Sequence, residues 1–198
     1  MRALFLENPG IAPSLKVKEI PIPSPSTGEV LVRVAACGFC HHDRLVMAGV
    51  LKRGVKPGVI LGHEISGEVA SIGEGVSQLS VGDKVVSLLT YSCGQCDRCQ
   101  QGREHRCRYG EGIGHSRNGG FAEYVVLSQH SLVRIRSDAD LVEACIFPCP
   151  MGVALQGVQD AANLQKGETM LVTGAGGGLG VHAVQFGVTL GAPVIAVT

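Results

Sequence analysis

Short runs rich in β-branched and other apolar residues occupy most of the chain up to about residue 135. The clearest of them cover residues 15–22, 29–36, 84–89 and 121–127. Turns that contain Pro or Gly separate these runs, and the combination is typical of β-strands. The pattern therefore predicts that the first part of the chain consists mostly of strands.

The pattern changes over residues 138–162, which are rich in Ala, Leu, Val and Gln and space their apolar positions more widely. Ser137 and Asp138 lie at its start, and both residue types favour the beginning of a helix. We expect helix in this stretch. We also expect the hinge between two domains to lie within residues 149–164.

The C-terminal part of the chain changes pattern three times. An apolar β-type run at 169–173 leads into a glycine-rich turn at 174–180, then an amphipathic run to Leu190 and a second β-type run at 194–197. This order predicts a strand, a glycine turn, a helix and a strand, which together form one β-α-β unit.

One β-α-β unit cannot cover both faces of its own parallel strands. The chain has 198 residues, which is more than one domain of roughly 100–200 residues needs but short for two. We therefore expect a complete, β-rich domain over residues 1–150 and a truncated α/β domain over residues 151–198.

The composition places the chain among globular proteins and narrows the choice of partners. Hydrophobic residues make up 45% and charged residues 17%, which excludes a disordered or fibrous chain. Seventeen basic side chains balance seventeen acidic ones, so no net field attracts nucleic acid or an anionic membrane. Glycine, with 28 residues, has about twice its usual share of roughly 7%, which indicates frequent tight turns.

The N-terminal segment lacks the pattern of a secretory signal. The first six residues are followed by Glu7, Asn8 and Pro9, and no stretch of 18 apolar residues occurs in the chain. We therefore expect a cytosolic protein, in which the eight cysteines stay reduced. Reduced cysteines bind metals or take part in chemistry more often than they form disulfides.

Four of the cysteines lie within fifteen residues: Cys93, Cys96, Cys99 and Cys107. Four thiolates at such short spacing can surround one tetrahedral Zn²⁺ at about 2.3 Å per bond, which leaves no ligand position open. The spacing thus predicts a closed, structural zinc site. Two disulfides or unpaired core cysteines are the alternatives, which a reducing compartment disfavours.

Arginines are frequent beside these cysteines, at Arg98, Arg103, Arg106 and Arg108. Four thiolates around a divalent ion leave a negative formal charge, and we interpret the arginines as an offset to it. A zinc ribbon that binds nucleic acid is the rival interpretation. Only Tyr91 and Tyr109 could stack on bases there, which argues against it.

A second set of candidate ligands, Cys40, His63 and Cys149, is spread along the chain. A lone Cys or His is more often a core or surface residue than a ligand, so the neighbouring residues decide. The two runs that contain Cys40 and His63 are Cys37-Gly38-Phe39-Cys40-His41-His42-Asp43 and Gly62-His63-Glu64-Ile65-Ser66-Gly67, the second followed by Gly73 and Val76.

The run from Gly62 to Val76 resembles, at every fixed position, the signature of the zinc-containing alcohol dehydrogenase family in the medium-chain dehydrogenase/reductase superfamily. The cysteine spacing over 93–107, the segment 81–85 and the stretch from Pro148 into the glycine loop are similar to that family as well. The resemblance covers essentially the whole chain. It implies a GroES-like barrel domain with a structural zinc lobe at 91–109, followed by the start of a Rossmann domain.

The resemblance also implies roles for individual residues. Cys40, His63 and Cys149 match the three protein ligands of the catalytic zinc, and three ligands with one open position are what zinc catalysis requires. Glu64 matches a residue that lies behind the ion or replaces a ligand. Asp43 matches the carboxylate that orients the zinc-binding histidine. A solvated surface carboxylate is the alternative for Glu64 and Asp43.

His42 departs from the family pattern, in which Ser or Thr usually passes the substrate proton toward solvent. The unperturbed pKa of imidazole is about 6.5, so His42 could exchange a proton near neutral pH, and proton relay by His42 is a hypothesis. His41 matches a position that often meets the cofactor pyrophosphate, and an exposed histidine without a role is the alternative. Cys37 and Cys145 fit neither zinc set, and we interpret them as small buried side chains.

The glycine loop predicts a site for a nicotinamide cofactor, because backbone N–H groups at a helix N-terminus can bind a pyrophosphate. Ala175 replaces the first glycine of the usual pattern, a variant that resembles the reductase branches of the family. A glycine-rich turn without a ligand is the alternative. The residues expected at the cofactor are Ala175, Gly177, Gly178, Leu179, Gly180 and Thr198. The neutral Thr198, at the end of the second strand, favours NADP slightly over NAD.

These patterns together predict a zinc-dependent oxidoreductase that transfers hydride between NAD(P) and an alcohol or carbonyl substrate, with two zinc ions per chain. A quinone or enoyl-thioester reductase of the same superfamily is the first alternative, and a zinc-stabilised fragment without catalytic activity is the second. We expect a small-molecule substrate, no nucleic-acid or membrane partner, and a homo-oligomer in the full-length form. A truncated chain is expected to be inactive alone.

Overall fold

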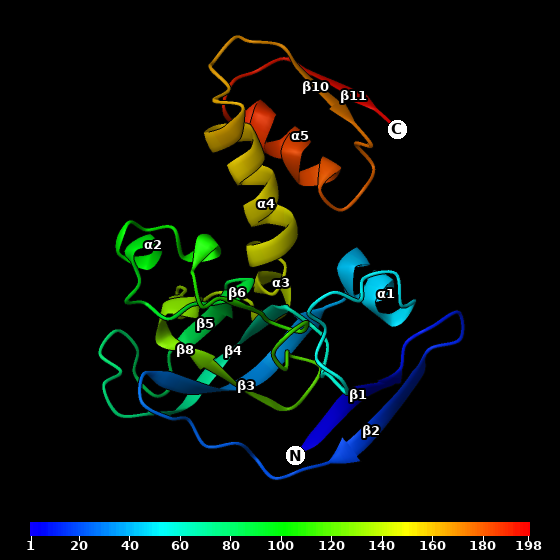
Figure 1. Cartoon of the computed structure of the whole chain (residues 1–198). Helices are drawn as coiled ribbons and strands as arrows, with labels where there is room; N and C mark the ends of the chain where they lie inside the picture. The colour runs from blue at the N-terminus through cyan, green and yellow to red at the C-terminus, as the bar shows by residue number, and fades with distance from the viewer. The chain divides into compact units, whose positions relative to one another are not determined.

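The computed structural model describes residues 1–198, which divide into two compact units, Met1–Cys145 and Ile146–Thr198. The first unit is built around a five-stranded antiparallel sheet with the order β8-β3-β4-β5-β9 (Figure 1). The strands are β3 (Glu29–Gly38), β4 (Glu64–Ile72), β5 (Lys84–Ser87), β8 (Tyr124–Ser128) and β9 (Leu132–Arg134). The register between β3 and β4 shifts twice, and such bulges increase the twist that curls a sheet.

Smaller elements surround this sheet. Two further antiparallel pairs are β1 (Arg2–Asn8) with β2 (Ser14–Glu19), and β6 (Thr90–Tyr91) with β7 (Glu111–Gly112). The helical segments of this unit are α1 (His41–Met47), α2 (Asp97–Gln100), η1 (Glu104–Arg106), η2 (Gln129–Ser131) and α3 (Leu141–Ala144). The first unit is thus β-rich, as the sequence predicted.

Two apolar clusters hold the first unit together. The larger lies on the sheet and contains Val30, Val32, Ile65, Val69, Leu79, Val85, Ile113, Val125, Leu127 and Leu132. The smaller contains Leu6, Val46, Val59 and Leu61. Burying one such side chain contributes about 1.5–3 kcal/mol relative to leaving it exposed. The smaller cluster therefore fixes α1, which carries Val46, beside the segment that leads into β4.

The second unit contains the predicted β-α-β arrangement. Strand β10 (Met170–Thr173) pairs in parallel with β11 (Val194–Val197), and α5 (Gly180–Thr189) connects them. Three short helical segments precede β10, namely η3 (Phe147–Met151), α4 (Gly152–Leu155) and η4 (Gln156–Ala161). These three segments follow one another without a gap, so the helix expected over 138–162 is confirmed for residues 147–161 and for α3. Pro148 and Pro150 lie in its first turn, where the helix is wider than a regular α-helix.

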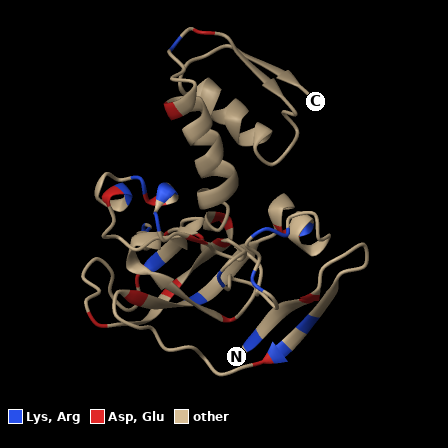
Figure 2. Ribbon diagram, in the orientation of Figure 1, with Lys and Arg blue, Asp and Glu red and all other residues tan.

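Charged side chains are scarce in the second unit. Only Asp160, Lys166 and Glu168 are charged, and most of this part of the ribbon is tan in Figure 2. None of the helices in the chain combines the length and the apolar character that a membrane span requires.

Candidate metal centres

The four cysteines of the segment 93–107 converge on one point. Their sulfur atoms all lie within 4.8 Å of one another. The Sγ–Sγ distances are 3.5 Å for Cys93 and Cys107, 3.6 Å for Cys96 and Cys99, and 3.9 Å for Cys96 and Cys107. Four sulfur atoms on a tetrahedral Zn²⁺ with bonds of about 2.3 Å lie about 3.8 Å apart. The donor set therefore fits zinc in identity, number and spacing.

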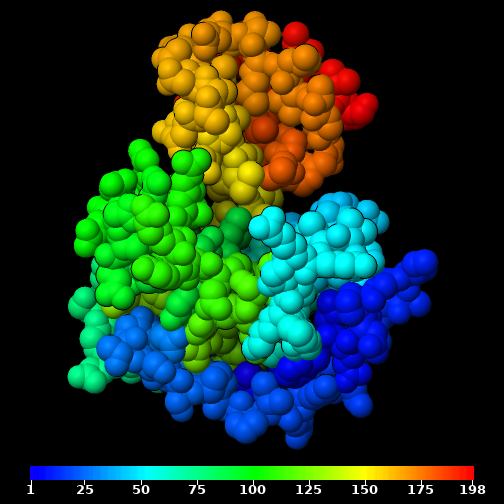
Figure 3. Space-filling model, in the orientation of Figure 1, coloured from blue at the N-terminus to red at the C-terminus, as the bar shows by residue number.

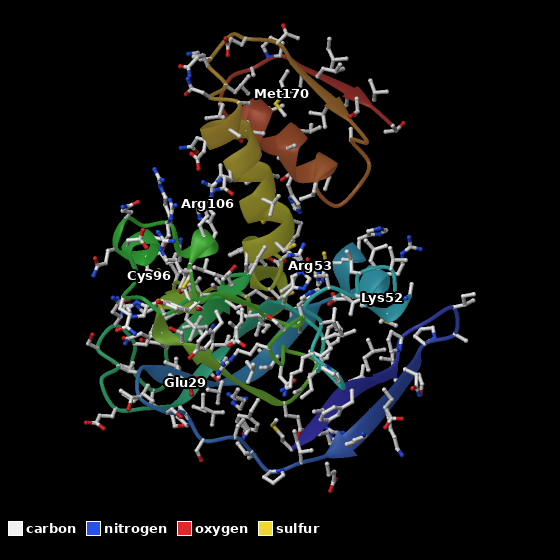
Figure 4. The ribbon with its side chains drawn as sticks, in the orientation of Figure 1. Glu29, Lys52, Arg53, Cys96, Arg106 and Met170 are labelled. Atoms are coloured by element: carbon white, nitrogen blue, oxygen red, sulfur yellow. The ribbon has the colours of Figure 1, made fainter.

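The zinc lobe, predicted at residues 91–109, is held at its base by polar contacts. The β6 and β7 pair closes the loop from which it extends, and Figure 4 labels Cys96 within it. Ser92, which is fully buried, donates its backbone N–H to Ser131 Oγ at 2.8 Å and its hydroxyl to the His130 carbonyl at 3.1 Å. The space-filling view shows the chain around residue 100, in green, at the surface of the first unit (Figure 3).

The thiols of the zinc lobe differ in acidity. Hydrogen bonds from the backbone N–H groups of Arg108 and Cys99 lower the pKa of Cys96 to about 6. Burial and a hydrogen bond with Cys96 raise the pKa of Cys99 to about 12. Since the thiolate is the form that binds a metal, Cys96 is ready as a ligand at neutral pH. Cys99 loses its proton only when a cation binds beside it.

The arginines of the lobe divide into two pairs. Arg108 makes two hydrogen bonds to the Asp97 carboxylate at 2.6 and 2.8 Å, and Arg98 lies 3.9 Å from the same group. The hydrogen bonds from Arg108 lower the pKa of Asp97. Arg103 and Arg106 are exposed. The offset of a negative zinc centre by these four side chains stays a prediction.

A second group of ligand atoms forms in the first unit from two segments that are distant in sequence. Cys40 caps α1, Glu64 is the first residue of β4, and His63 directly precedes that strand. Their ligand atoms all lie within 4.8 Å of one another, and His63 and Glu64 are buried. Sulfur, imidazole and carboxylate donors in one buried group fit a Zn²⁺ ion. Cys149, the third predicted ligand, belongs to the second unit and lies in η3.

Asp43 connects the two segments. Its fully buried carboxylate accepts hydrogen bonds from the backbone N–H of Cys40 at 2.9 Å and of Gly62 at 3.2 Å. Its Oδ1 also lies 3.5 Å from His63 Nδ1. Burial raises the pKa of Asp43, but the contact with His63 and the two backbone N–H groups outweigh burial, so the net pKa is lowered. A solvated surface carboxylate, the alternative considered for Asp43, is therefore wrong.

The glycine before His63 has a steric reason. Gly62 has φ of +91°, and a Cβ atom there would lie 2.6 Å from the sulfur of Cys37. Both conditions exclude a larger residue. The signature that identifies His63 in the sequence is thus partly a packing requirement of the chain around it.

His42 has a second histidine beside it that the sequence analysis missed. The His42 ring centre lies 5.1 Å from that of His63 and 5.1 Å from that of His115. Burial is the main cause that lowers the pKa of His42 below its usual value. His41 is exposed. Nothing in the spacing of the chain indicates His115, because a loop between β7 and β8 brings it to α1.

The glycine loop of the second unit brings its predicted residues together. Ala175 donates its N–H to the Val197 carbonyl at 2.9 Å, and a Cβ at Gly176 would lie 3.7 Å from Thr198 Cγ2. Thr198 therefore lies beside the loop. A Cβ at Gly180 would lie 2.2 Å from the Gly174 carbonyl oxygen, so only glycine permits this turn into α5. Of the other expected residues, Gly177, Gly178 and Leu179 are exposed.

Known proteins match the chain along its whole length. Residues 26–137 match the alcohol dehydrogenase GroES-like domain, and the acryloyl-coenzyme A reductase of Sulfurisphaera tokodaii is 40% identical over 198 residues. The chain belongs to the zinc alcohol dehydrogenase-like family of the medium-chain dehydrogenase/reductases. The resemblance noted in the sequence and the GroES-like fold of the first unit are thus confirmed.

Two solved structures of this zinc alcohol dehydrogenase-like family illustrate the similarity. A crystal structure of an NAD-dependent alcohol dehydrogenase has a TM-score of 0.90 and 35% identity, and covers 99% of the chain. A cobalt- and zinc-bound thermostable alcohol dehydrogenase from Pyrobaculum aerophilum has a TM-score of 0.88 and 37% identity, and covers 100% of the chain. The chain spans 58% of the Sulfurisphaera protein and 57% and 59% of these two structures, which is just over half of each.

Proposed function

We propose that the protein is a zinc-dependent oxidoreductase that transfers hydride between NAD(P) and an alcohol or carbonyl substrate. The observation that carries this proposal is the grouping of Cys40, His63 and Glu64 ligand atoms within 4.8 Å, next to the buried Asp43. Membership of the zinc alcohol dehydrogenase-like family supports it. In this proposal residues 1–150 form the catalytic domain, and residues 151–198 form the first part of the nucleotide-binding domain.

Cys40, His63 and Cys149 are the proposed ligands of the catalytic zinc, with Glu64 behind them. Burial and then the charge of Glu64 raise the pKa of Cys145, which indicates that this thiol lies near the group. Cys149 follows Cys145 by four residues, and a chain of that length reaches at most about 14 Å. The proposed third ligand is therefore tethered within reach of the other two.

The chain's own residues prepare this centre. Asp43 Oδ1 lies 3.5 Å from His63 Nδ1 and would orient that ring, which leaves Nε2 as the nitrogen that would face a metal. His42, whose ring centre lies 5.1 Å from that of His63, is the proposed proton relay. When bound, the zinc ion supplies a Lewis acid for an alcohol or carbonyl oxygen, and NAD(P) supplies the hydride chemistry.

Further parts of the chain have proposed roles. Cys93, Cys96, Cys99 and Cys107 would hold a structural zinc, which gives two ions per chain. Because the second unit has few charged side chains, its glycine loop would hold a pyrophosphate through backbone N–H groups. Thr198 leads us to propose NADP in preference to NAD. A small-molecule substrate, a homo-oligomer and a cytosolic location complete the proposal.

An enoyl-thioester reductase is the second candidate. Two relatives with 40% identity, from Sulfurisphaera tokodaii and Metallosphaera sedula, are both acryloyl-coenzyme A reductases, whereas three curated relatives that are alcohol dehydrogenases have 35–38% identity. This reaction would use the same cofactor loop but an activated double bond in place of an alcohol.

A pair of assays separates the two candidates. The purified full-length protein, of which residues 1–198 form one part, is tested for reduction of NAD⁺ and NADP⁺ by a series of primary and secondary alcohols, and for oxidation of NADPH by acryloyl-coenzyme A. The proposal predicts alcohol-dependent reduction that Cys40→Ala abolishes. Turnover of the thioester alone would assign the second candidate. If neither reaction occurs and NADPH fluorescence shows no binding, the oxidoreductase proposal fails.

A further inference from the structure

We propose that His42 and His115 form an additional, histidine-only site for a divalent transition-metal ion. It lies in the first unit beside the proposed catalytic centre but shares none of its ligands. The site depends on two imidazole nitrogens that are buried and have no hydrogen-bond partner, His42 Nδ1 and His115 Nδ1. It does not depend on the proposed oxidoreductase function.

The hydrogen bond of His115 fixes which of its nitrogens can bind a metal. Its Nε2 lies 2.9 Å from the carbonyl oxygen of Arg53, a residue labelled in Figure 4. A carbonyl oxygen only accepts, so Nε2 carries the proton and donates it. In the neutral ring Nδ1 then has a free lone pair. Metal-binding histidines commonly donate their other ring N–H to a backbone carbonyl in this way.

The two rings have the separation that a shared ion requires. Their centres are 5.1 Å apart, with an angle of 49° between the ring planes. Two imidazoles on one tetrahedral ion, with metal–nitrogen bonds of about 2.0–2.1 Å, have ring centres about 5 Å apart. The His63 ring is also near His42, but its Nδ1 faces Asp43, so it is committed to the proposed catalytic centre.

The backbone holds His115 in place without any ion. Its carbonyl accepts a hydrogen bond from the Lys56 N–H at 2.8 Å, and its own N–H donates to the Gly112 carbonyl at 3.1 Å. With the side-chain bond to Arg53, three contacts fix this residue. His42 lies on α1, which the smaller apolar cluster anchors through Val46. Both ligands are therefore positioned before an ion binds, which lowers the entropic cost of binding.

The chemistry of the donors identifies the class of ion. Neutral imidazole suits Zn²⁺, Ni²⁺ and Cu²⁺, whereas Mg²⁺ and Ca²⁺ prefer oxygen ligands. Two protein ligands leave the other positions to water, so the ion should exchange more readily than ions held by three or four ligands. Because His42 is the proposed proton relay, an ion here would remove the lone pair that the relay uses.

The test uses Ni²⁺ as the probe. Protein that holds its two proposed zinc ions, after exchangeable zinc has been removed by dialysis, is dialysed against a low excess of Ni²⁺, and both metals are counted by elemental analysis. We expect one Ni²⁺ per chain in the unmodified protein and none in His115→Phe or His42→Ser, with the zinc content unchanged. His182→Gln is the matched control, because His182 also has a buried Nδ1 without a partner but has no second imidazole beside it. This control should keep the Ni²⁺.

Two further measurements keep the result interpretable. Zinc content and thermal unfolding show whether each variant is folded, and His42→Ser, at a half-buried position, is the less disruptive change. Cys40→Ala should retain the Ni²⁺ even where it loses a zinc ion. The proposal is overturned if the unmodified protein binds no Ni²⁺, if His115→Phe and His42→Ser both keep it, or if thiolate-to-nickel absorption shows that Ni²⁺ has entered a cysteine site.

Discussion

The zinc lobe and the group around His63 use similar ligands but are assembled in opposite ways. The lobe takes its four cysteines from one segment of fifteen residues. Neither of the two apolar clusters includes a residue between Cys93 and Cys107. Cys40 and His63 come from separate segments that Asp43 joins and that the smaller apolar cluster supports. Residues 93–107 would therefore need a bound ion to adopt their structure. The residues around His63 are already placed by the fold before an ion binds.

This difference predicts unequal consequences when a ligand is lost. Ligands that lie close together in sequence, in a segment without an apolar core, depend on the metal for their structure, because metal binding there is coupled to folding. Ligands from distant segments, such as Cys40 and His63, lie on elements that apolar packing already stabilises. Their metal therefore contributes to catalysis more than to the stability of the fold.

The largest effect is expected from Cys99→Ser in the zinc lobe. Loss of a ligand should release the ion, unfold residues 93–107 and lower the free energy of unfolding by roughly 5 kcal/mol. Thermal unfolding and amide hydrogen exchange measure both effects. Cys145→Ala, which removes another buried cysteine outside both groups, is the control and should leave exchange in the lobe unchanged. A lobe that stays protected in Cys99→Ser would contradict the contrast.

The attachment of the lobe to the sheet can be tested separately. Glu29 accepts hydrogen bonds from Tyr91 at 2.8 Å and from Arg117 at 2.6 Å, and Arg117 lies over the Tyr91 ring at 3.7 Å. Glu29→Gln should cost about 1.5–3 kcal/mol in unfolding free energy, because it removes a charged hydrogen-bond partner of the partly buried Arg117, which keeps only its ion pair with Glu111 at 3.0 Å. Both zinc ions should remain, as elemental analysis would show. Loss of the lobe zinc in this variant would mean that the lobe depends on its anchor as well as on its metal.

Asp43→Asn tests the second site with an intermediate effect. The amide keeps the shape of the side chain but weakens the orientation of His63, and such supporting groups typically change metal affinity about 10- to 100-fold. Competition with a chelator measures the affinity of each ion separately. Only the ion at His63 should be released more readily. Equal metal affinity in the variant and the unmodified protein would contradict the role of Asp43 in orienting His63.

The smallest effect is a pH dependence at Glu29. Burial raises the pKa of Glu29, but hydrogen bonds from the Ser26 N–H and Tyr91, with the charge of Arg117, outweigh burial and lower it overall. A lowered pKa stabilises the fold above the unfolded value of about 4.3, and this contribution is lost as the pH falls through the folded pKa. The stability difference between the unmodified protein and Glu29→Gln should therefore be constant from pH 7 to about pH 5 and shrink below pH 4. A difference that grows in acid would contradict this assignment.

Much of the fold was accessible from the sequence because its signals are local. The runs at 29–36 and 84–89 correspond to β3 and β5, and the last run at 194–197 coincides with β11. The central strand β4 was not singled out, because the small residues Ser66, Gly67 and Ala70 interrupt its apolar pattern. A Cβ at Gly67 would lie 2.2 Å from the Arg33 carbonyl oxygen, so the close packing of β4 against β3 requires glycine at this position. Glycine is a poor strand former, and its presence weakens the strand pattern in the sequence.

The candidate sites also differ in how far local sequence signals predicted them. The cysteine spacing predicted the convergence of Cys93 and Cys107, because so short a segment has few ways to spread its ligands. Family resemblance, not spacing, indicated Cys40 and His63. Neither could reveal His115 beside His42, or Arg117 on Tyr91, because those contacts depend on how loops return to the sheet.

The zinc content of the purified protein tests the central claim most directly. The account predicts two zinc ions per chain in the unmodified protein, and one each in Cys40→Ala and Cys93→Ala, with a cooperative thermal transition retained only in Cys40→Ala. A single ion in the unmodified protein that Cys40→Ala leaves in place would contradict the second metal centre, and no bound zinc at all would contradict both.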